Sequence, residues 1–111
     1  MIRYTTPLLP LEVEGIDLTQ NQDVYVSMKQ DAVYMEKRGG ALTITYDDES
    51  NISTISYGLT QAESTKFDFG AAVEVQVNFI NEAGIRDATN IARIPVMRNL
   101  LNREIKYGDQ T

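Results

Sequence analysis

Apolar and polar residues alternate along several short segments of this chain. The clearest run extends from Val73 to Phe79, and a second extends from Val24 to Met28. Successive side chains of a β-strand point to opposite faces, so each run has one face for a core and one for water. The pattern predicts a protein built from short amphipathic strands.

Turn residues separate further segments of the same kind. We expect strands at about 23–30, 32–38, 42–46, 52–59, 71–80 and 85–96. Gln30-Asp31 is the expected turn of the first hairpin, and Asn81–Gly84 is the expected turn of the last one. Ile52 is out of phase with Ile55 and Tyr57, which predicts a bulge or an earlier start of that strand.

One short helix is expected between strands, at 60–66. Thr60 and Glu63 have the spacing of a capping box, in which a hydroxyl and a glutamate satisfy backbone groups at a helix start. The helix would carry the chain from one sheet to the other, as connections in Greek-key sandwiches often do.

These elements predict one all-β domain over residues 1–111, an antiparallel β-sandwich of about seven strands with immunoglobulin-like or Greek-key order. The first part, 1–20, contains Pro7 and Pro10 and should be an extended arm or edge strand whose leucines pack on the core. Residues 97–111 form a tail, either a final edge segment or a segment that binds a partner. The expected core residues are Val24, Val26, Met28, Leu42, Ile44, Ile55, Tyr57, Leu59, Phe67, Val73, Val75, Val77, Ile94 and Val96.

The amino-acid composition limits the classes of function that we expect for this protein. The chain has 111 residues, a formal net charge of −6, no cysteine and no histidine. Without histidine or cysteine the usual general base, thiolate ligands and disulfides are excluded, so we expect neither an enzyme nor a cofactor. The acidic balance argues against a nucleic-acid partner, and no apolar run approaches a membrane span. The first ten residues lack a signal-peptide pattern, so we expect a soluble product made in the cytoplasm.

The densest acidic cluster is Asp47–Asn51. A calcium loop starting at Asp47 would need glycine at its sixth position and glutamate at its twelfth, where this chain has Ile52 and Gly58. A solvated hairpin loop therefore explains the cluster better. An enzyme that used Asp47 and Asp48 is the weakest of the functional interpretations.

Tyrosines are the other candidates, because tyrosine is enriched in recognition surfaces. Tyr25 and Tyr34 fall on the outward parity of the first hairpin. They either stabilise the sheet as a cross-strand pair or form a surface that binds a partner. Tyr4 and Tyr107, near the two ends of the chain, are candidates for contacts outside the domain.

Three segments carry a resemblance to a protein family. Residues 59–67 read LTQAESTKF, residues 73–78 read VEVQVN, and Ile94-Pro95-Val96 follows. In this order they resemble small uncharacterised proteins encoded in phage and prophage structural gene clusters of Gram-positive bacteria. The arrangement is also similar to the N-terminal β-sandwich domains of phage baseplate proteins. The resemblance implies a virion or tail-associated structural role, and it brings no catalytic or ligand-binding residues with it.

The leading hypothesis is a non-enzymatic phage assembly protein that contacts other phage structural proteins or further copies of itself. Strand addition or apolar docking at the sheet edges and at the leucine-bearing ends would make these contacts, and the finished protein would join a virion. The alternative is a small module that binds a carbohydrate or peptide. The residues expected to contact a partner are Leu8, Leu9, Leu11, Tyr25, Tyr34, Leu100 and Leu101.

Overall fold

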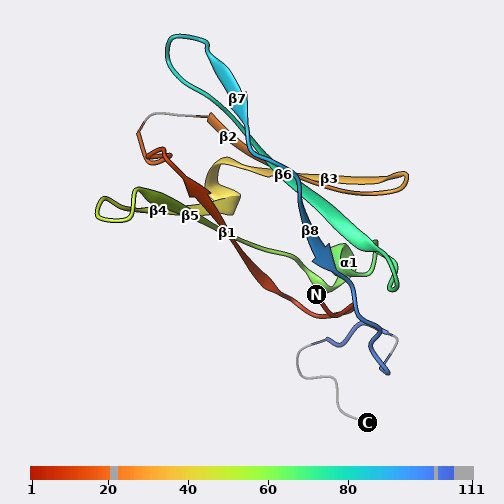
Figure 1. Cartoon of the computed structure of the whole chain (residues 1–111). Coiled ribbons are helices and arrows are strands. Elements are labelled where there is room, and N and C mark those ends of the chain that lie inside the picture. The colour runs from red at the N-terminus through yellow and green to blue at the C-terminus, as the bar shows by residue number, and fades with distance from the viewer. Residues whose placement is uncertain (21–22, 102, 107–111) are drawn as a thin grey trace.

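The computed structural model describes residues 1–20, 23–101 and 103–106, and it consists of two packed antiparallel sheets (Figure 1). The predicted all-β sandwich is confirmed. Its strands are β1 (Leu8–Glu14), β2 (Asp23–Gln30), β3 (Val33–Arg38), β4 (Leu42–Asp47), β5 (Ile52–Gly58), β6 (Ala72–Ile80), β7 (Arg86–Ala88) and β8 (Ala92–Pro95). A one-turn helix, α1 (Gln61–Ser64), and a 3-10 turn, η1 (Gly39–Ala41), complete the set.

The smaller sheet has the order β1-β5-β4, and the larger has the order β3-β2-β6, with β7 and β8 both paired to the far edge of β6. The chain changes sheets three times: between β1 and β2, through η1 between β3 and β4, and through α1 between β5 and β6. The predicted role of the short helix as a crossover is therefore confirmed.

The core lies between the sheets and follows the predicted alternation. Every second residue of β6 from Val73 to Phe79 is buried, and Phe67 between α1 and β6 is fully buried. Three predicted core residues, Leu42, Ile44 and Ile94, are only partly buried against the core. Among the described residues, the buried apolar ones that the prediction left out are Val13, Leu18, Met35 and Phe79.

Strand β1 forms an edge of its sheet, which explains its proline. The Leu59 N–H donates to the Pro7 carbonyl and the Gly15 N–H donates to the Asn51 carbonyl, so odd-numbered residues of β1 turn their backbone groups toward β5. Pro10 therefore faces the free edge, where its missing N–H costs no ladder bond.

Both alternatives expected at Ile52, a bulge and an earlier strand start, are wrong, because β5 begins at Ile52 and is regular there. The pairing of β5 with β1 and β4 runs without interruption to Ile52, which lies on the outer face, and Ser53 takes the buried position. The Ser53 hydroxyl accepts a hydrogen bond from the Leu18 N–H (2.9 Å) and donates to the Ile16 carbonyl (2.6 Å). A serine can occupy a core position here because its polar atom is fully bonded.

The first hairpin turns one residue later than expected. Gln30 is the last residue of β2 and pairs with Val33, so Asp31 and Ala32 make the turn, with Asp31 at a φ of 51°. Gln30 thus lies in β2 and not in the turn. Its side chain is buried, and its amide group binds the backbone that leads from α1 to β6. It donates to the carbonyls of Asp68 (2.8 Å) and Ala71 (3.1 Å) and accepts from the Asp68 N–H (2.7 Å).

The single strand expected at 85–96 is divided by a β-bulge. The Thr89 N–H donates to the Val77 carbonyl, and Ala92 pairs with Val75, so one more residue separates these positions on the outer strand than on β6. The Thr89 hydroxyl accepts from the Val77 N–H (3.1 Å) in place of a backbone carbonyl. β8 then ends at Pro95, as the proline predicts.

We predict that Tyr57→Phe stabilises the protein. Tyr57 is 1% exposed, and its hydroxyl has no hydrogen-bond partner among the described residues. Removing an unsatisfied buried hydroxyl should raise the free energy of unfolding by about 1 kcal/mol, measured by denaturant titration.

Burial also raises the pKa of Tyr57 to about 12. The folded state thus holds this proton more tightly than the unfolded chain, so this part of the stability is complete below about pH 10 and declines as the pH rises toward 12. Tyr57→Phe should remove this decline. An unchanged alkaline profile in the variant would contradict the assignment.

Candidate functional site

One end of the sandwich brings together the first residues of the chain and those that follow β8. Ile2 and Met97 form an isolated parallel bridge, in which the Met97 N–H donates to the Met1 carbonyl (2.7 Å) and the Arg3 N–H donates to the Met97 carbonyl (3.1 Å). The Asn99 side-chain amide donates to the Arg3 carbonyl (3.0 Å). We call this the terminal end (Figure 1, bottom).

Helix α1 holds both chain segments at the terminal end. The Ser64 hydroxyl donates to the Thr5 carbonyl (2.8 Å). On the other side, the Gln61 amide donates to the Ile105 carbonyl (2.6 Å) and accepts from the Ile105 N–H (2.7 Å), as a neighbouring strand would. The segment after β8 is thus folded back on the domain.

The predicted capping box at the start of α1 is confirmed. The Glu63 N–H donates to the Thr60 hydroxyl (3.1 Å), and the Thr60 N–H donates to the Glu63 carboxylate (3.0 Å). The Lys37 ammonium of β3 also lies 2.6 Å from this carboxylate. Burial acts to raise the pKa of Glu63, but the hydrogen bonds from Lys37 and Thr60 and the charge of Lys37 outweigh it and lower the pKa.

Exposed apolar side chains are concentrated on these segments. We define the terminal patch as Ile2, Phe69, Met97, Leu100, Leu101 and Ile105, which are between 43% and 90% exposed. Phe69 belongs with the others because the neighbouring Gly70 N–H donates to the Val96 carbonyl (3.4 Å). Apolar residues gathered in this way on an ordered support are typical of an interaction surface.

The structure separates the residues that the sequence analysis grouped as partner contacts. Leu100 (90% exposed) and Leu101 (43%) belong to the terminal patch, and Leu8 at the start of β1 is 72% exposed. Leu9 and Leu11 pack against the core instead. Tyr107 lies outside the described residues.

Sequence reasoning missed Ile2, Phe69 and Met97. Each lies in a segment without regular alternation, and its exposure depends on a neighbour far away in the sequence. The pairing of Ile2 with Met97 has no local signal.

The two tyrosines of the first hairpin do share an outward face. They line one hollow of about 360 Å³ on the larger sheet, together with Glu36, Asn78 and Arg86. The Tyr34 hydroxyl is 3.0 Å from the Ser27 hydroxyl, and its side chain is 59% exposed. Tyr25 lies instead beside the Arg38 guanidinium, 5.7 Å from its ring centre. They are neighbours on one face rather than a direct cross-strand pair, because Tyr25 pairs with Arg38 and Tyr34 pairs with Lys29.

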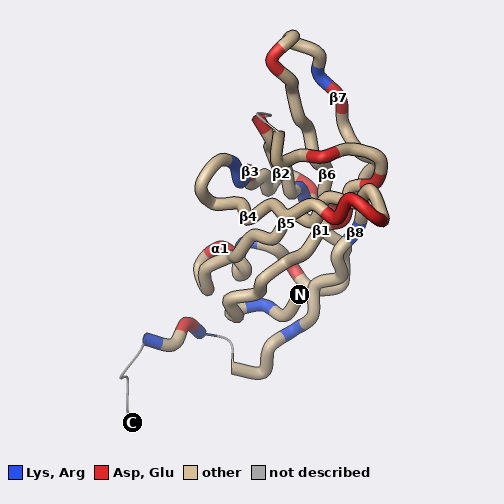
Figure 2. Tube along the Cα trace, turned by 90° about the vertical axis from the view of Figure 1, so that its left-hand side faces the viewer, with Lys and Arg blue, Asp and Glu red and all other residues tan. Residues whose placement is uncertain are grey.

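Charge is distributed unevenly between the ends of the molecule (Figure 2). The terminal segments carry Arg3, Lys66, Arg98, Arg103 and Lys106, together with the acidic residues Glu63, Asp68 and Glu104. The opposite end, with the connection after β1 and the β4–β5 and β6–β7 turns, carries most of the acidic residues, among them Glu12, Glu14, Asp17, Asp23, Asp47, Asp48, Glu49, Glu82 and Asp87. We call it the loop end.

Within residues 1–20, 23–101 and 103–106, no three acidic side chains are grouped in a way that could hold a metal ion. The same residues contain no helix with the length and apolarity needed to cross a membrane. No protein-family model matches the chain, and no curated protein matches its sequence significantly.

Substitutions at Glu63 should separate the cap from the ion pair. Because the pKa of Glu63 is lowered in the folded state, its contribution to stability is complete above its unfolded pKa of 4.5 and is lost as the pH falls through the folded value. Glu63→Gln keeps the capping hydrogen bonds but removes the charge, so it should cost less than about 1 kcal/mol at neutral pH and weaken the loss of stability in acid.

Thr60→Ala is the matched comparison. It removes the cap but leaves the ion pair, and it should cost about 1 kcal/mol while the acid dependence persists. Denaturant titrations across acidic pH would check both variants. Equal acid profiles for wild type and Glu63→Gln would contradict the role of the Lys37 pair.

Proposed function

We propose that this protein is a non-enzymatic structural or assembly component of a phage or prophage particle, associated with the tail or baseplate. In this role it acts through protein–protein contacts, is made in the cytoplasm and then joins the particle. The observation that carries the proposal is the terminal patch, an exposed apolar surface on segments that the fold holds in place.

The nature of the support strengthens this proposal. A frayed chain end with exposed leucines would lose conformational entropy on binding, which weakens association. Here the patch residues lie on segments already ordered by backbone bonds at Met97 and by the Gln61 amide at Ile105. A surface ordered before binding avoids part of that cost.

The phage assignment itself depends on the resemblance of residues 59–67, 73–78 and 94–96 to proteins from phage structural gene clusters. The fold agrees with that resemblance, since the compared baseplate domains are also β-sandwiches. The apolar patch and the resemblance are independent of each other, and both favour an assembly role.

Apolar docking predicts that charge placed in the patch prevents assembly. Leu100→Asp combined with Leu101→Asp should remove the chain from complexes formed on co-expression with the products of the genes that flank its own. Size-exclusion chromatography with light scattering would measure the complexes. Ile85→Asp is the matched control, because Ile85 is 65% exposed but lies in the β6–β7 turn at the loop end.

The outcome that contradicts the proposal is equally concrete. Flanking genes that encode metabolic enzymes, or structural gene products that never bind the wild-type chain, would remove its support. Loss of binding in Ile85→Asp as well would show that the effect is not specific to the patch.

A second candidate function is carbohydrate binding at the hollow lined by Tyr25 and Tyr34. An exposed tyrosine ring bordered by a carboxylate, an amide and a guanidinium offers both a stacking surface and hydrogen bonds to a sugar. Here Glu36, Asn78 and Arg86 supply these groups, and the Arg86 guanidinium is held 3.1 Å from the Asn78 side-chain oxygen.

If this surface binds a sugar, Tyr34→Ala should weaken the binding at least about tenfold, because it removes the exposed ring. Binding would be found on a glycan array and measured by calorimetry. Tyr46→Ala is the control, since Tyr46 lies on β4 of the other sheet. Binding that is absent, or equal in Tyr34→Ala and wild type, would exclude this function.

A further inference from the structure

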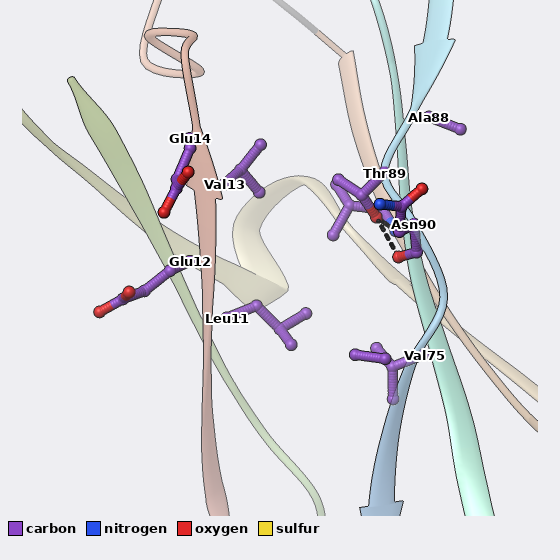
Figure 3. Close-up of a pocket in the computed structure, with 10 residues that line it drawn as sticks. Leu11, Glu12, Val13, Glu14, Val75, Ala88, Thr89 and Asn90 are labelled. Atoms are coloured by element: carbon purple, nitrogen blue, oxygen red, sulfur yellow. Dashed lines mark hydrogen bonds between the residues drawn. The ribbon is translucent and has the colours of Figure 1, made fainter.

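A groove of about 420 Å³ opens along one side of the sandwich, between β1 and the bulged β7–β8 edge (Figure 3). Leu11 and Val13 point into it from β1, and Val75 faces them from β6. Val13 and Val75 belong to the buried core, so the floor of the groove is apolar. Thr89 and Asn90, at the bulge, supply polar atoms to its far wall.

The β1 wall of the groove is an unpaired strand edge. Among the described residues, β1 pairs with β5 alone. Odd-numbered residues of β1 bond to β5, so the backbone groups of the even-numbered residues point to the other side. Glu12 and Glu14 therefore each turn an N–H and a carbonyl toward the free edge, whereas Pro10 turns a carbonyl alone. This edge offers the hydrogen bonds that an added strand needs.

The two glutamates also carry the charge of this edge. Their side chains point to the outer face of β1, away from Leu11 and Val13 (Figure 3). All the named strands pair antiparallel, and in an antiparallel addition the residues bonded to Glu12 and Glu14 place their side chains beside these carboxylates. The residue between them, opposite Val13, points into the groove. The edge thus favours two basic side chains two residues apart, with an apolar one between them.

We propose that the free edge of β1 binds an extended segment of another protein in which basic and apolar residues alternate. The segment adds antiparallel to β1, with its basic side chains beside Glu12 and Glu14 and its apolar side chains in the groove. This inference goes beyond the proposed function, because it concerns a different surface from the terminal patch and does not require a phage particle.

The segment comes from another protein because this chain has no counterpart to the pattern. None of its ten lysines and arginines lies two positions from another in the sequence. Strands β3 and β4, at the far edges of the two sheets, carry the exposed acidic residues Glu36 and Asp47. Neither edge of a second copy therefore offers the alternate basic residues that Glu12 and Glu14 would attract.

Synthetic peptides test this chemistry. A short peptide of alternating lysine and valine, blocked at both ends, should bind the full-length chain in fluorescence anisotropy, and more weakly at high ionic strength. Replacing its lysines by glutamate should weaken binding at least about tenfold, as should replacing its valines by asparagine. The matched control has the same composition with lysines and valines in separate blocks, and it should bind as weakly. Equal binding of the alternating and block peptides would overturn the proposal.

Charge reversal in the protein should exchange its preference. Glu12→Lys with Glu14→Lys should weaken binding of the lysine peptide at least about tenfold and strengthen binding of the glutamate peptide. Asp48→Lys with Glu49→Lys makes the same change of net charge in the β4–β5 turn, outside the groove lining, and should bind as wild type does. Circular dichroism and thermal melting would check that both variants are folded. Equal effects in the two variants would show a general charge effect and overturn the proposal.

Methylated peptides test the backbone hydrogen bonds. Methylating the backbone nitrogens of the lysines removes the N–H groups that face Glu12 and Glu14, so it should weaken binding at least about tenfold. Methylating the backbone nitrogens of the valines leaves those N–H groups in place and is the matched control. A loss that is equal in the two peptides, or confined to the valine-methylated one, would overturn the antiparallel addition.

The remaining outcomes separate this inference from the proposed function. Self-association of the chain alone in sedimentation velocity, abolished by Glu12→Lys with Glu14→Lys, would show that the groove takes a second copy and would overturn the proposal. A chain that joins complexes through the terminal patch but binds no alternating peptide refutes this inference alone. A chain that binds the peptide but no flanking gene product refutes the proposed function alone.

Discussion

The arrangement of this sandwich depends on the rule that a polar group taken out of water must be hydrogen-bonded. Apart from the Tyr57 hydroxyl, which is buried without a hydrogen-bond partner, the buried polar side chains among the described residues are Gln30, Ser53 and Ser64. Each binds the backbone of a segment outside the sheets. Ser53 holds residues 16–18 between β1 and β2, and Gln30 holds residues 68–71 between α1 and β6. Ser64 holds Thr5 beside α1. An apolar pattern can stack two sheets, but these three side chains fix where the chain leaves and re-enters them.

The same constraint produces the exposed surface at the terminal end. Ser64 and Gln61 lie on one short helix and bind opposite segments of the chain, residue 5 on one side and residue 105 on the other. Phe67 and Val96 are buried at this end, whereas the apolar side chains of the terminal patch remain exposed. They are consequently held outward on ordered backbone, and this is the physical basis on which we propose this end, rather than a cleft, as the contact surface.

Much of the fold could be predicted from the sequence because the signals concerned are local. The alternation from Val73 to Phe79 and the Thr60–Glu63 spacing each depend on residues within one element, and the structure has both. The burial of Ser53 and Gln30 was not predictable in this way. Each occupies a core position because its side chain is hydrogen-bonded to backbone groups 35 to 41 positions away in the sequence. In β5 the buried position next to Ile52 is taken by Ser53, so the apolar residues of this strand did not alternate regularly and Ile52 suggested a bulge.

The candidate surfaces show the same difference between local sequence signals and long-range contacts. Leu100 and Leu101 could be predicted as exposed because they follow the last strand signal. The groove between β1 and the β7–β8 edge could not be predicted. It requires the free edge of β1 to face a β-bulge, where the Val77 N–H donates to the Thr89 hydroxyl in place of a backbone carbonyl. Nothing in the sequence near Thr89 distinguishes that residue from an ordinary strand threonine.

The composition of the β1 edge also decides which kind of self-contact it permits. In a two-fold pairing of β1 with β1 of another copy, the even-numbered residues of the two strands would oppose each other. Pro10 would then occupy a position that should donate a hydrogen bond, and two sets of Glu12 and Glu14 would share one face. Charged residues and proline at an edge act in this way as a barrier to symmetric pairing. The edge of β1 therefore discourages symmetric pairing with a second copy of itself, which is how a strand edge can stay exposed.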